Sequence, residues 1–265
     1  MKTTDDTQLS VSGVTLQFGG VAALSDVNFS ADRGETVGII GTNGSGKTSL
    51  LNCVSGVYRP DAGTITLDGQ RIDRSRAHKL ASQGVARTFQ NPEAPPELTV
   101  TDFTMLGRHT AMGGFGLVAY GLGIPYFSGH ESRHRSYALA ALARVEMTDL
   151  AETPMADLSY GLAKRADLAR ALASGPKLLL LDEPAAGLNE QERAQLAELL
   201  ADLVSDEITV LLVEHDMSFV SRVCPRVMVL VDGNLLYDGP TAPAMRDPRV
   251  VQSFLGGVLE EEAPS

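Results

Sequence analysis

The sequence has no tryptophan and only two cysteines in 265 residues. Cys53 and Cys224 belong to separate predicted elements, and neither has a second cysteine or a histidine nearby at metal-ligand spacing. The sequence therefore argues against a disulfide scaffold or a zinc site, and it fits a protein of a reducing compartment. Aromatic residues make up 5% of the chain and hydrophobic residues 43%, a composition typical of an aliphatic globular protein.

Long hydrophobic runs are also absent. The longest, such as 178–181 and 227–231, are far shorter than the roughly 20 apolar residues that a membrane-spanning helix needs. Residues 1–10 are polar and acidic, so we expect no signal peptide. Any role at a membrane is therefore expected to depend on a partner protein.

Positive charge is scarce. The chain has 22 lysines and arginines against 33 acidic residues, which gives a net charge of −11. Non-specific binding to nucleic acid depends on clustered lysine and arginine side chains that neutralise phosphates. We therefore expect no nucleic acid among the partners of this protein.

The patterns that are present predict strands alternating with helices. Residues 9–18 and 23–29 alternate between apolar and polar side chains, as in antiparallel strands of a half-exposed sheet. Hairpin turns are expected at Asp68-Gly69 and Asp232-Gly233. Apolar runs predict buried strands that are each followed by a helix, and they are Thr36–Ile40, Leu178–Asp182 and Thr209–Val213. These elements predict an α/β fold with an antiparallel part and an inserted helical block.

A single domain is predicted to cover residues 1–265. Between about 98 and 170 the apolar spacing becomes helical, which predicts an inserted helical subdomain. A glycine-rich stretch at 113–129 interrupts it and is expected to be a loop or a short irregular insertion. The acidic end of the chain, from about 257 to 265, is expected to be disordered.

The segment from Gly41 to Thr48 fits the phosphate-loop pattern of a glycine, four residues, and then glycine, lysine and threonine. It lies between a buried strand and a predicted helix at 49–57, the context that the motif requires. Glycines let backbone N–H groups point at phosphate oxygens, and the helix N-terminus adds positive charge. Lys47 is expected to bind the terminal phosphates and Thr48 to hold Mg²⁺; a plain tight turn with an exposed lysine is the alternative. The predicted nucleotide-binding residues here are Gly41, Asn43, Gly44, Ser45, Gly46, Lys47, Thr48 and Ser49.

Two carboxylates end the apolar strand at 178–182. Asp182 can hold Mg²⁺ through water, and Glu183 is placed to orient or polarise an attacking water, although a strand can also end in two acids by chance. His215 follows the next apolar strand, and a neutral imidazole near the γ-phosphate can sense it and fix the water. The remaining histidines are expected at the surface, and they are His78, His109, His130 and His134.

Further motifs resemble, in order along the chain, those of the ATP-binding-cassette (ABC) ATPases. Arg87-Thr-Phe-Gln90 is similar to the glutamine loop of that family, and Leu-Ser-Tyr-Gly-Leu at 158–162 is similar to its signature. Residues 186–189 match the loop after the catalytic glutamate, and His215 matches the switch histidine. Phe18 stands where the family stacks an aromatic ring on adenine.

This resemblance implies an ABC-type P-loop NTPase fold with a RecA-like core sheet, an antiparallel β subdomain and an inserted α-helical subdomain. It implies an ATPase whose cofactors are ATP and Mg²⁺. Gln90 would act in catalysis and would bind Mg²⁺ together with Thr48 and Asp182. Ser159 and Gly161 of the signature would contact the ATP held by a second subunit.

Within the family, the chain is most similar to the ATPase subunits of branched-chain amino-acid importers. Asp-Glu-Pro-Ala-Ala-Gly-Leu-Asn at 182–189 and Val-Glu-His-Asp-Met at 213–217 are typical of that subgroup. Importers of urea and amides are near relatives and stay an alternative. Two positions depart from the general signature: Tyr160 replaces a glycine, as is familiar in this subgroup, and Leu162 replaces a glutamine of the shared ATP site.

The resemblance also implies several partners. One chain has one phosphate loop and one signature, which in this fold lie too far apart to share a nucleotide, so two subunits must pair head to tail. The second ATPase subunit is either a copy or a paralogue. Two transmembrane permease subunits and, indirectly, an extracytoplasmic solute-binding protein complete the expected importer. This chain would be peripheral, on the cytoplasmic face of the cell membrane.

Other ABC ATPases are the competing hypotheses. A DNA-repair or chromosome-organising ATPase would need long heptad coiled coils or zinc hooks, and neither heptads nor cysteine pairs occur. A translation factor would carry two cassettes and a basic linker. A soluble scaffold ATPase for iron–sulfur assembly shares the motifs, and co-purification with membrane proteins would distinguish an importer subunit from it.

Overall fold

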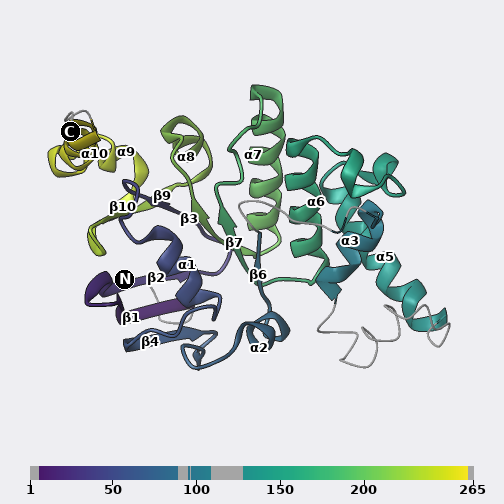
Figure 1. Ribbon diagram of the computed structural model, residues 1–265, viewed down its shortest axis with the longest axis horizontal. Coiled ribbons are helices and arrows are strands. Elements are labelled where there is room, and N and C mark those ends of the chain that lie inside the picture. The colour runs from purple at the N-terminus through teal and green to yellow at the C-terminus, as the bar shows by residue number, and fades with distance from the viewer. Residues whose placement is uncertain (1–5, 89–94, 96, 109–127, 262–265) are drawn as a thin grey trace.

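The computed structural model describes residues 6–88, 95, 97–108 and 128–261, which form two sheets with helices around and between them (Figure 1). The smaller sheet is antiparallel, with the strand order β2-β1-β4-β5. Asp68 and Gly69 both have positive φ, 48° and 72°, so the predicted hairpin turn between β4 and β5 is confirmed. The strands are β1 (Thr7–Phe18), β2 (Val21–Asp32), β4 (Ala62–Leu67) and β5 (Gln70–Arg71).

The larger sheet has six strands in the order β10-β9-β3-β8-β7-β6, and all are parallel except β10. Every residue of β3, β7 and β8 is buried, because both faces of the sheet are covered. The three buried strands predicted from the sequence are confirmed. The strands are β3 (Thr36–Ile40), β6 (Val85–Arg87), β7 (Leu178–Asp182), β8 (Thr209–Val213), β9 (Arg226–Val231) and β10 (Asn234–Pro240).

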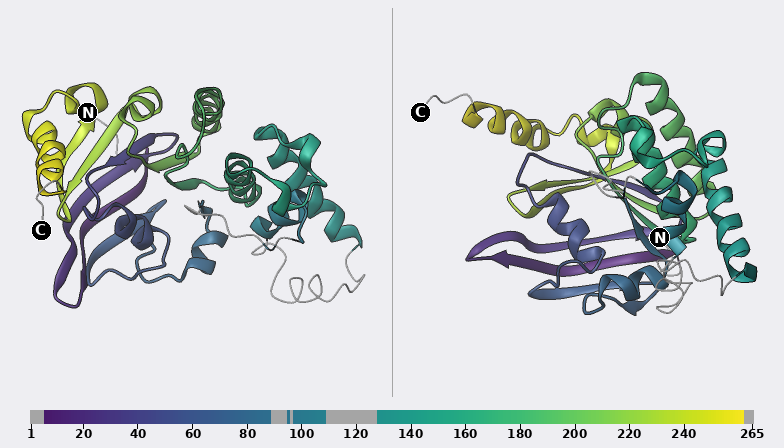
Figure 2. Two further views of the ribbon diagram at one scale, coloured as in Figure 1. Left: turned by 45° about the horizontal axis from the view of Figure 1, so that its top comes forward. Right: turned by 45° about the vertical axis from the view of Figure 1, so that its right-hand side comes forward.

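Successive residues of the central strands face two different cores. Leu178 and Leu180 pack with the antiparallel sheet and with α1 (Lys47–Val54), which lies between the two sheets (Figure 2). Leu179 and Leu181 point the other way, into the core built by the remaining helices. A strand with two buried faces needs this continuous apolar run, and the run is what predicted β7 from the sequence.

Helices on the second face extend to one end of the molecule (Figure 1). Those over the sheet include α7 (Glu190–Ser205) and α8 (Met217–Val223). At the end, α3 (Val100–Met105), α5 (Ser128–Arg144) and α6 (Tyr160–Ala173) pack on one another. The shorter or peripheral elements are α2 (Ala77–Ser82), η1 (Leu106–Arg108), η2 (Thr148–Leu150), η3 (Met155–Asp157), α9 (Thr241–Ala244) and α10 (Pro248–Glu261). In the described ranges, no helix combines the length and apolar character needed to cross a membrane.

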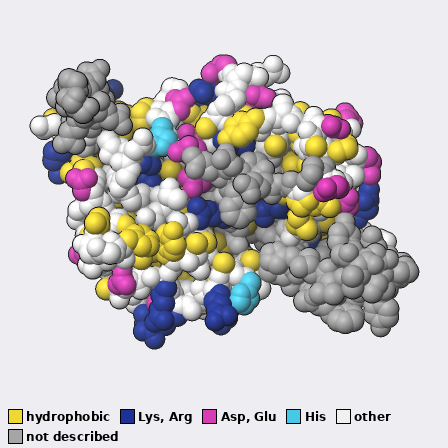
Figure 3. All heavy atoms as spheres, viewed as in Figure 1, with side chains coloured by type: hydrophobic (Ala, Val, Ile, Leu, Met, Phe, Trp, Pro, Cys, Tyr) yellow, Lys and Arg dark blue, Asp and Glu magenta, His cyan; other side chains and the backbone are white. Residues whose placement is uncertain are grey.

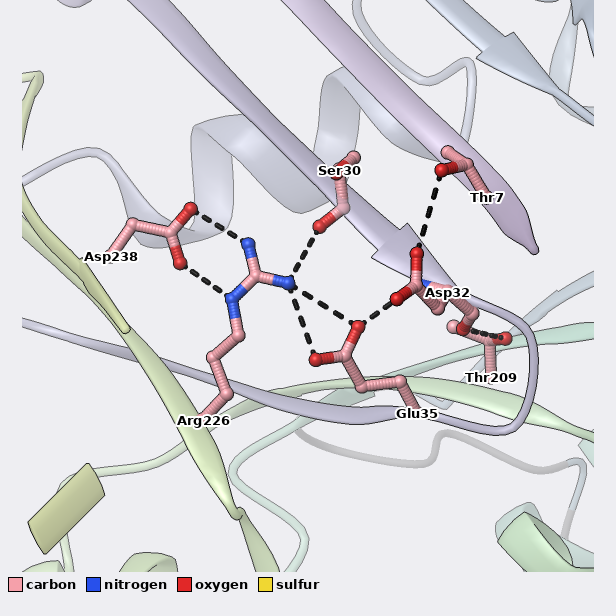
Figure 4. A network of polar contacts seen from close by, with 7 residues as sticks. All are labelled: Thr7, Ser30, Asp32, Glu35, Thr209, Arg226 and Asp238. Atoms are coloured by element: carbon pink, nitrogen blue, oxygen red, sulfur yellow. Dashed lines mark hydrogen bonds and ion pairs between the residues drawn. The ribbon is translucent and has the colours of Figure 1, made fainter. Parts of the chain in front are cut away.

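A polar network at the start of β9 ties the two sheets together (Figure 4). Arg226 binds both carboxylate oxygens of Asp238 on β10 at 2.7 Å, and it also donates to the carbonyl of Ser30 on β2 at 2.9 Å. Glu35 accepts from the same guanidinium at 3.2 Å. These carboxylates raise the pKa of Arg226 above its usual value, with the hydrogen bond to Asp238 as the main cause. The cation therefore holds β2 against the β9–β10 hairpin, whose predicted turn at Asp232-Gly233 is also confirmed.

Some elements differ from those expected. The helix predicted at 49–57 is α1, which begins two residues earlier and ends three residues earlier. No sequence pattern predicts the edge strand β6, because its three residues are too few to show one. Of the glycine-rich stretch 113–129, all but the first two residues of α5 lie outside the described residues. The segment 257–265 begins inside α10 and ends outside the described residues, so its disorder stays a prediction.

Candidate functional site

The loop between β3 and α1 curls tightly around its own backbone. Gly41 and Gly46 have φ values of 154° and 100°, and a Cβ at Gly46 would lie 2.5 Å from the carbonyl oxygen of Ala23. A Cβ at Gly41 would lie 2.2 Å from the carbonyl oxygen of Leu230. Only glycine fits these two positions. The first N–H groups of α1 have no partners within the helix, and no side chain caps them, so they are available to an anion.

Lys47 is folded back over this loop. Its Nζ donates to the carbonyls of Gly41 at 2.9 Å and Thr42 at 2.7 Å, and the residue is only 6% exposed. Burial lowers the pKa of Lys47, and the charges of Glu183 and Asp182 act in the opposite direction. The alternative interpretation of a turn with an exposed lysine is therefore wrong.

The rest of the loop presents polar groups of two kinds. Ser45 Oγ is buried and has no hydrogen-bond partner in the described part of the chain. Asn43, Gly44 and Thr48 are exposed, and Ser49 is half-buried. An orphaned hydroxyl beside a buried ammonium and free helix N–H groups fits a phosphate group better than an empty turn.

The carboxylates of β7 lie at the edge of the sheet where β3 enters this loop. Because β3, β8 and β7 are parallel neighbours, their carboxyl ends meet at that edge. Asp182 is 5% exposed and forms an ion pair with Arg87 Nη2 at 3.1 Å. Glu183 has a φ of 50°, unusual for a residue other than glycine, and its Oε1 lies 2.7 Å from Nε2 of His215. The structure thus brings Lys47, Asp182, Glu183 and His215 to one edge.

Arg87 is a site neighbour whose contacts the sequence did not reveal. Besides Asp182, its guanidinium binds Asn52 of α1 and Ser55 Oγ, the latter at 3.3 Å. Arg170 of α6 donates to the carbonyl of Arg87 at 2.8 Å. One partly buried cation therefore joins the phosphate-loop helix to the end of β7.

Two more buried charges hold the chain around Glu183. Lys164 of α6 donates to the carbonyls of Glu183 at 2.6 Å and Ala186 at 3.0 Å. Glu214, directly before His215, accepts the N–H of Ala185 at 2.7 Å. Burial raises the pKa of Glu214 above its usual value, while its hydrogen bonds to backbone N–H groups act against that shift. The sequence motifs assign no role to Lys164 or to Glu214.

The signature residues lie elsewhere. Ser159 caps α6 by accepting the N–H of Leu162, and Gly161 follows in the first turn. Figure 1 shows α6 at the helical end, whereas the phosphate loop lies between the sheets. A Cβ at Gly161 would come within 3.1 Å of Glu192 Oε1, so a larger residue there would require the Glu192 side chain to shift. Leu162 packs against the core on the helical side, which accounts for an apolar residue where the general signature has glutamine.

The structure bears differently on the sequence predictions for Phe18, Gln90 and His134. Phe18 is 47% exposed, and its ring centroid lies 5.2 Å from that of Tyr58 in an edge-to-face arrangement, which leaves ring surface accessible. Gln90 lies outside the described residues. The surface prediction for His134 is wrong: its side chain is 9% exposed, and Arg108 Nε lies 3.5 Å from its Nδ1. Arg108 belongs to η1, 26 residues earlier in the chain, and no sequence pattern connects the two residues.

Among the residues that the structure describes, no three His, Cys, Asp or Glu side chains converge as a metal site. The Thr48 hydroxyl and the Asp182 carboxylate belong to the loop-and-strand edge described above. Such a sparse oxygen set suits Mg²⁺, which keeps several waters and shares phosphate oxygens as ligands. On the face drawn in Figure 3, basic and acidic side chains adjoin each other near the middle of the molecule.

Comparison with known proteins gives consistent matches over the chain. A family model described as "ABC transporter" matches residues 24–186. The high-affinity branched-chain amino acid transport ATP-binding protein BraF of Pseudomonas aeruginosa is 38% identical over 249 residues, covering 94% of this chain and 97% of BraF. The corresponding LivG of Escherichia coli K12 is 36% identical, with the same coverage.

Solved structures agree with these relatives. A nucleotide-free ATP-binding cassette from an ABC transporter superposes with a TM-score of 0.84 at 26% identity, covering 94% of this chain and 98% of that one. A second structure is a dimeric cassette in a post-hydrolysis state, bound to ADP and phosphate. It has a TM-score of 0.73 at 26% identity, and the match covers 88% of this chain and 98% of the cassette chain.

Proposed function

The chain belongs to the ABC transporter family and is the ATP-binding, ATP-hydrolysing subunit of an importer, and we propose that this importer takes up branched-chain amino acids. The support for the solute is the match to BraF and LivG over nearly their whole length. An ATPase of this kind does not touch the solute, so the solute follows from the partners with which it assembles.

The proposed roles begin with ATP binding. The N–H groups at the start of α1, the Ser45 hydroxyl and the Lys47 ammonium bind the phosphates, since Lys47 can exchange its two carbonyl contacts for phosphate oxygens. Asn43, Gly44 and Ser49 complete the loop. Phe18 stacks on adenine with its accessible ring surface.

Thr48 and Asp182 are proposed to hold Mg²⁺, with Gln90 as a further ligand from outside the described residues. The metal neutralises charge that develops on the phosphates during transfer. Arg87 keeps the Asp182 carboxylate at the carboxyl end of β7 through their 3.1 Å ion pair.

The contact between Glu183 and His215 is the single observation that carries the proposed chemistry. With Glu183 Oε1 at 2.7 Å from His215 Nε2, a carboxylate and an imidazole sit together at the edge where the phosphates bind. Glu183 orients and polarises the attacking water, and His215 holds that carboxylate and senses the γ-phosphate.

The signature is proposed to act on a second subunit. Because Ser159 and Gly161 lie at the start of α6, away from the phosphate loop of the same chain, two subunits pair head to tail and each signature closes over the other's ATP. The partner is a copy or a paralogue. Two permease subunits, and through them an extracytoplasmic solute-binding protein, complete the importer on whose cytoplasmic face this chain sits.

Co-purification tests the assembly and the solute together. The chain is isolated in mild detergent, its companions are identified, and the recovered complex is reconstituted for uptake of labelled leucine, with urea as the competing solute. We expect two hydrophobic membrane proteins, a second ATPase subunit and ATP-dependent leucine uptake. Recovery with soluble iron–sulfur assembly proteins would contradict the importer, and uptake of urea alone would contradict the solute.

A further inference from the structure

Glu214 is a buried carboxylate that the proposed chemistry does not use. It directly follows β8, it is 3% exposed, and both of its oxygens accept backbone hydrogen bonds. Oε1 accepts the N–H of Ala185 at 2.7 Å, and Oε2 accepts the N–H of His215 at 3.1 Å. The two donors come from the two different segments that carry Glu183 and His215.

The segment after β7 needs such support because its backbone is strained. Glu183 has a φ of 50°, a conformation that persists in a non-glycine residue only where neighbouring contacts determine it. The N–H of Glu183 donates to the carbonyl of Val213 at 2.9 Å, and Ala185 donates to Glu214 two residues later. Both acceptors, the Val213 carbonyl and the Glu214 carboxylate, belong to the segment that leads into His215.

A carboxylate at this position is costly for the fold. Burial penalises its charge, and the charge of Glu183 faces it as well. An apolar side chain would avoid both penalties but would leave the N–H groups of Ala185 and His215 unpaired. The carboxylate is the side chain that offers both of them an acceptor.

We propose that Glu214 is a positioning residue that fixes Glu183 and His215 relative to each other for ATP hydrolysis. The proposal rests on the roles given to these two residues under the proposed function. Glu214 acts through its contacts with the backbone of these two segments. Loss of those contacts lets the Glu183 carboxylate drift from the attacking water, and a displacement of about 1 Å costs on the order of 10²-fold in rate.

The variants Glu214→Ala and Glu214→Gln test this arrangement in the complete transporter, well below the melting temperature of each variant. Glu214→Ala is expected to lower kcat about 10- to 100-fold and to change the KM for ATP less than about twofold. Glu214→Gln keeps the shape of the side chain, but its NH₂ group replaces one of the two oxygen acceptors and cannot accept a hydrogen bond from a backbone N–H group. One of the two contacts is therefore lost, and we expect the kcat of this variant to fall as well. A raised KM at unchanged kcat in Glu214→Ala, or a wild-type kcat in Glu214→Gln, would overturn the proposal.

Asp73→Ala is the matched control for simple loss of stability. Asp73 is likewise a buried carboxylate, and it accepts the N–H of Ile65 at 3.2 Å and the Nε of Arg71 at 2.8 Å, among residues that have no role in the site. We expect this variant to lower the melting temperature while kcat stays at the wild-type value. An equal fall in kcat for Asp73→Ala and Glu214→Ala would show that Glu214 contributes to stability alone, and it would overturn the proposal.

A double-mutant cycle separates this proposal from the function on which it rests. If Glu214 acts through Glu183, adding Glu214→Ala to Glu183→Gln produces no further loss of phosphate release in single-turnover reactions. Losses that multiply would overturn the positioning role and leave the role of Glu183 intact. A Glu183→Gln protein that hydrolyses ATP at the wild-type rate would instead contradict the proposed function itself.

Discussion

At the scale of the residue, Lys47 lies between its own loop and two carboxylates. Its ammonium donates to Gly41 and Thr42, and burial lowers its pKa while Glu183 and Asp182 oppose that shift. The buried cation is thus already directed at the region that the phosphates are proposed to enter. Its replacement therefore removes an attractive charge and also the contacts that shape the loop.

Lys47→Ala is expected to weaken ATP binding about 10- to 100-fold, the size of a lost charge-assisted hydrogen bond. Calorimetric titration with ATP measures the change in affinity. Lys79→Ala is the control, since Lys79 is exposed on α2 and has no part in the site. Unchanged ATP affinity in Lys47→Ala would contradict the phosphate-loop assignment.

Phe18 is expected to act on the base alone. Stacking of a base on an aromatic ring contributes about 1–3 kcal/mol, so Phe18→Ala should raise the ATP requirement about tenfold or more at a largely unchanged maximal rate. Binding of inorganic tripolyphosphate, which has no base, should stay the same. Phe18→Tyr keeps the ring and should behave like the wild type. Equal losses for ATP and tripolyphosphate would show that Phe18 supports the loop instead of the base.

At the scale of the element, α6 is connected to the segment that carries Glu183. Lys164 lies four residues after Tyr160 on α6, and its Nζ contacts the carbonyls of Glu183 and Ala186 and lies 5.0 Å from the Tyr160 ring. That ring in turn packs against Gly187, where a Cβ would come within 3.1 Å of it. A helix whose first turn is proposed to meet the partner's ATP therefore holds the catalytic segment of its own chain.

Lys164→Met keeps the length and the packing of the side chain but removes the donors. We expect kcat to fall about tenfold, because the carbonyls at 183 and 186 lose their charged partner and the segment loosens. Arg165→Met on the same helix is the control, since Arg165 binds Gln195 and not this segment. The rates of both variants are measured in the assembled transporter. A kcat for Lys164→Met equal to that of Arg165→Met would contradict the connection.

Elements with a strong pattern were predictable, and contacts between distant residues were not. The apolar runs of β3, β7 and β8 and the two turns with positive φ follow from local chemistry, so the sequence predicts them. The strand β6 has only three residues and takes its conformation from its pairing with β7. Arg87 reaches Asp182 across 95 residues of sequence, and such a contact exists only once the chain has folded.

In the candidate site, too, some residues were predictable from local patterns and others were not. Lys47, Asp182, Glu183 and His215 follow strands that carry clear patterns, and the parallel sheet places all of them at one edge. Lys164 and Glu214 stabilise that edge through backbone atoms, which no motif of side chains encodes. Leu162 departs from the general signature because it faces the core of its own chain.

At the scale of the whole molecule, the two halves of an ATP site lie at different places on one chain. The phosphate loop leads into α1 and the carboxylates stand at the end of β7, whereas the signature stands at the start of α6, at the helical end (Figure 1). The Arg226 network joins the two sheets, and the parallel pairing of β3, β8 and β7 holds the loop and the carboxylates at one edge of the larger sheet. Under the proposed function, a complete site requires a second molecule, and we expect closure of the pair to depend on ATP.

The variant Glu183→Gln tests this account most directly, because it separates ATP binding from hydrolysis. The amide keeps the shape of Glu183 but loses the charge that polarises water, while Lys47, Thr48, Ser159 and Gly161 stay in place. ATP-dependent pairing is followed by light scattering together with phosphate release, using the physiological ATPase partner if the pair is heteromeric. Asp182→Asn is the comparison, and we expect it to weaken Mg²⁺ dependence and ATP binding along with turnover.

We expect the Glu183→Gln protein to bind ATP, to form a dimer that persists, and to release almost no phosphate, whereas the wild-type dimer dissociates as ATP is consumed. Phosphate release by Glu183→Gln near the wild-type rate would contradict the role of Glu183 and, with it, the central claim about this site.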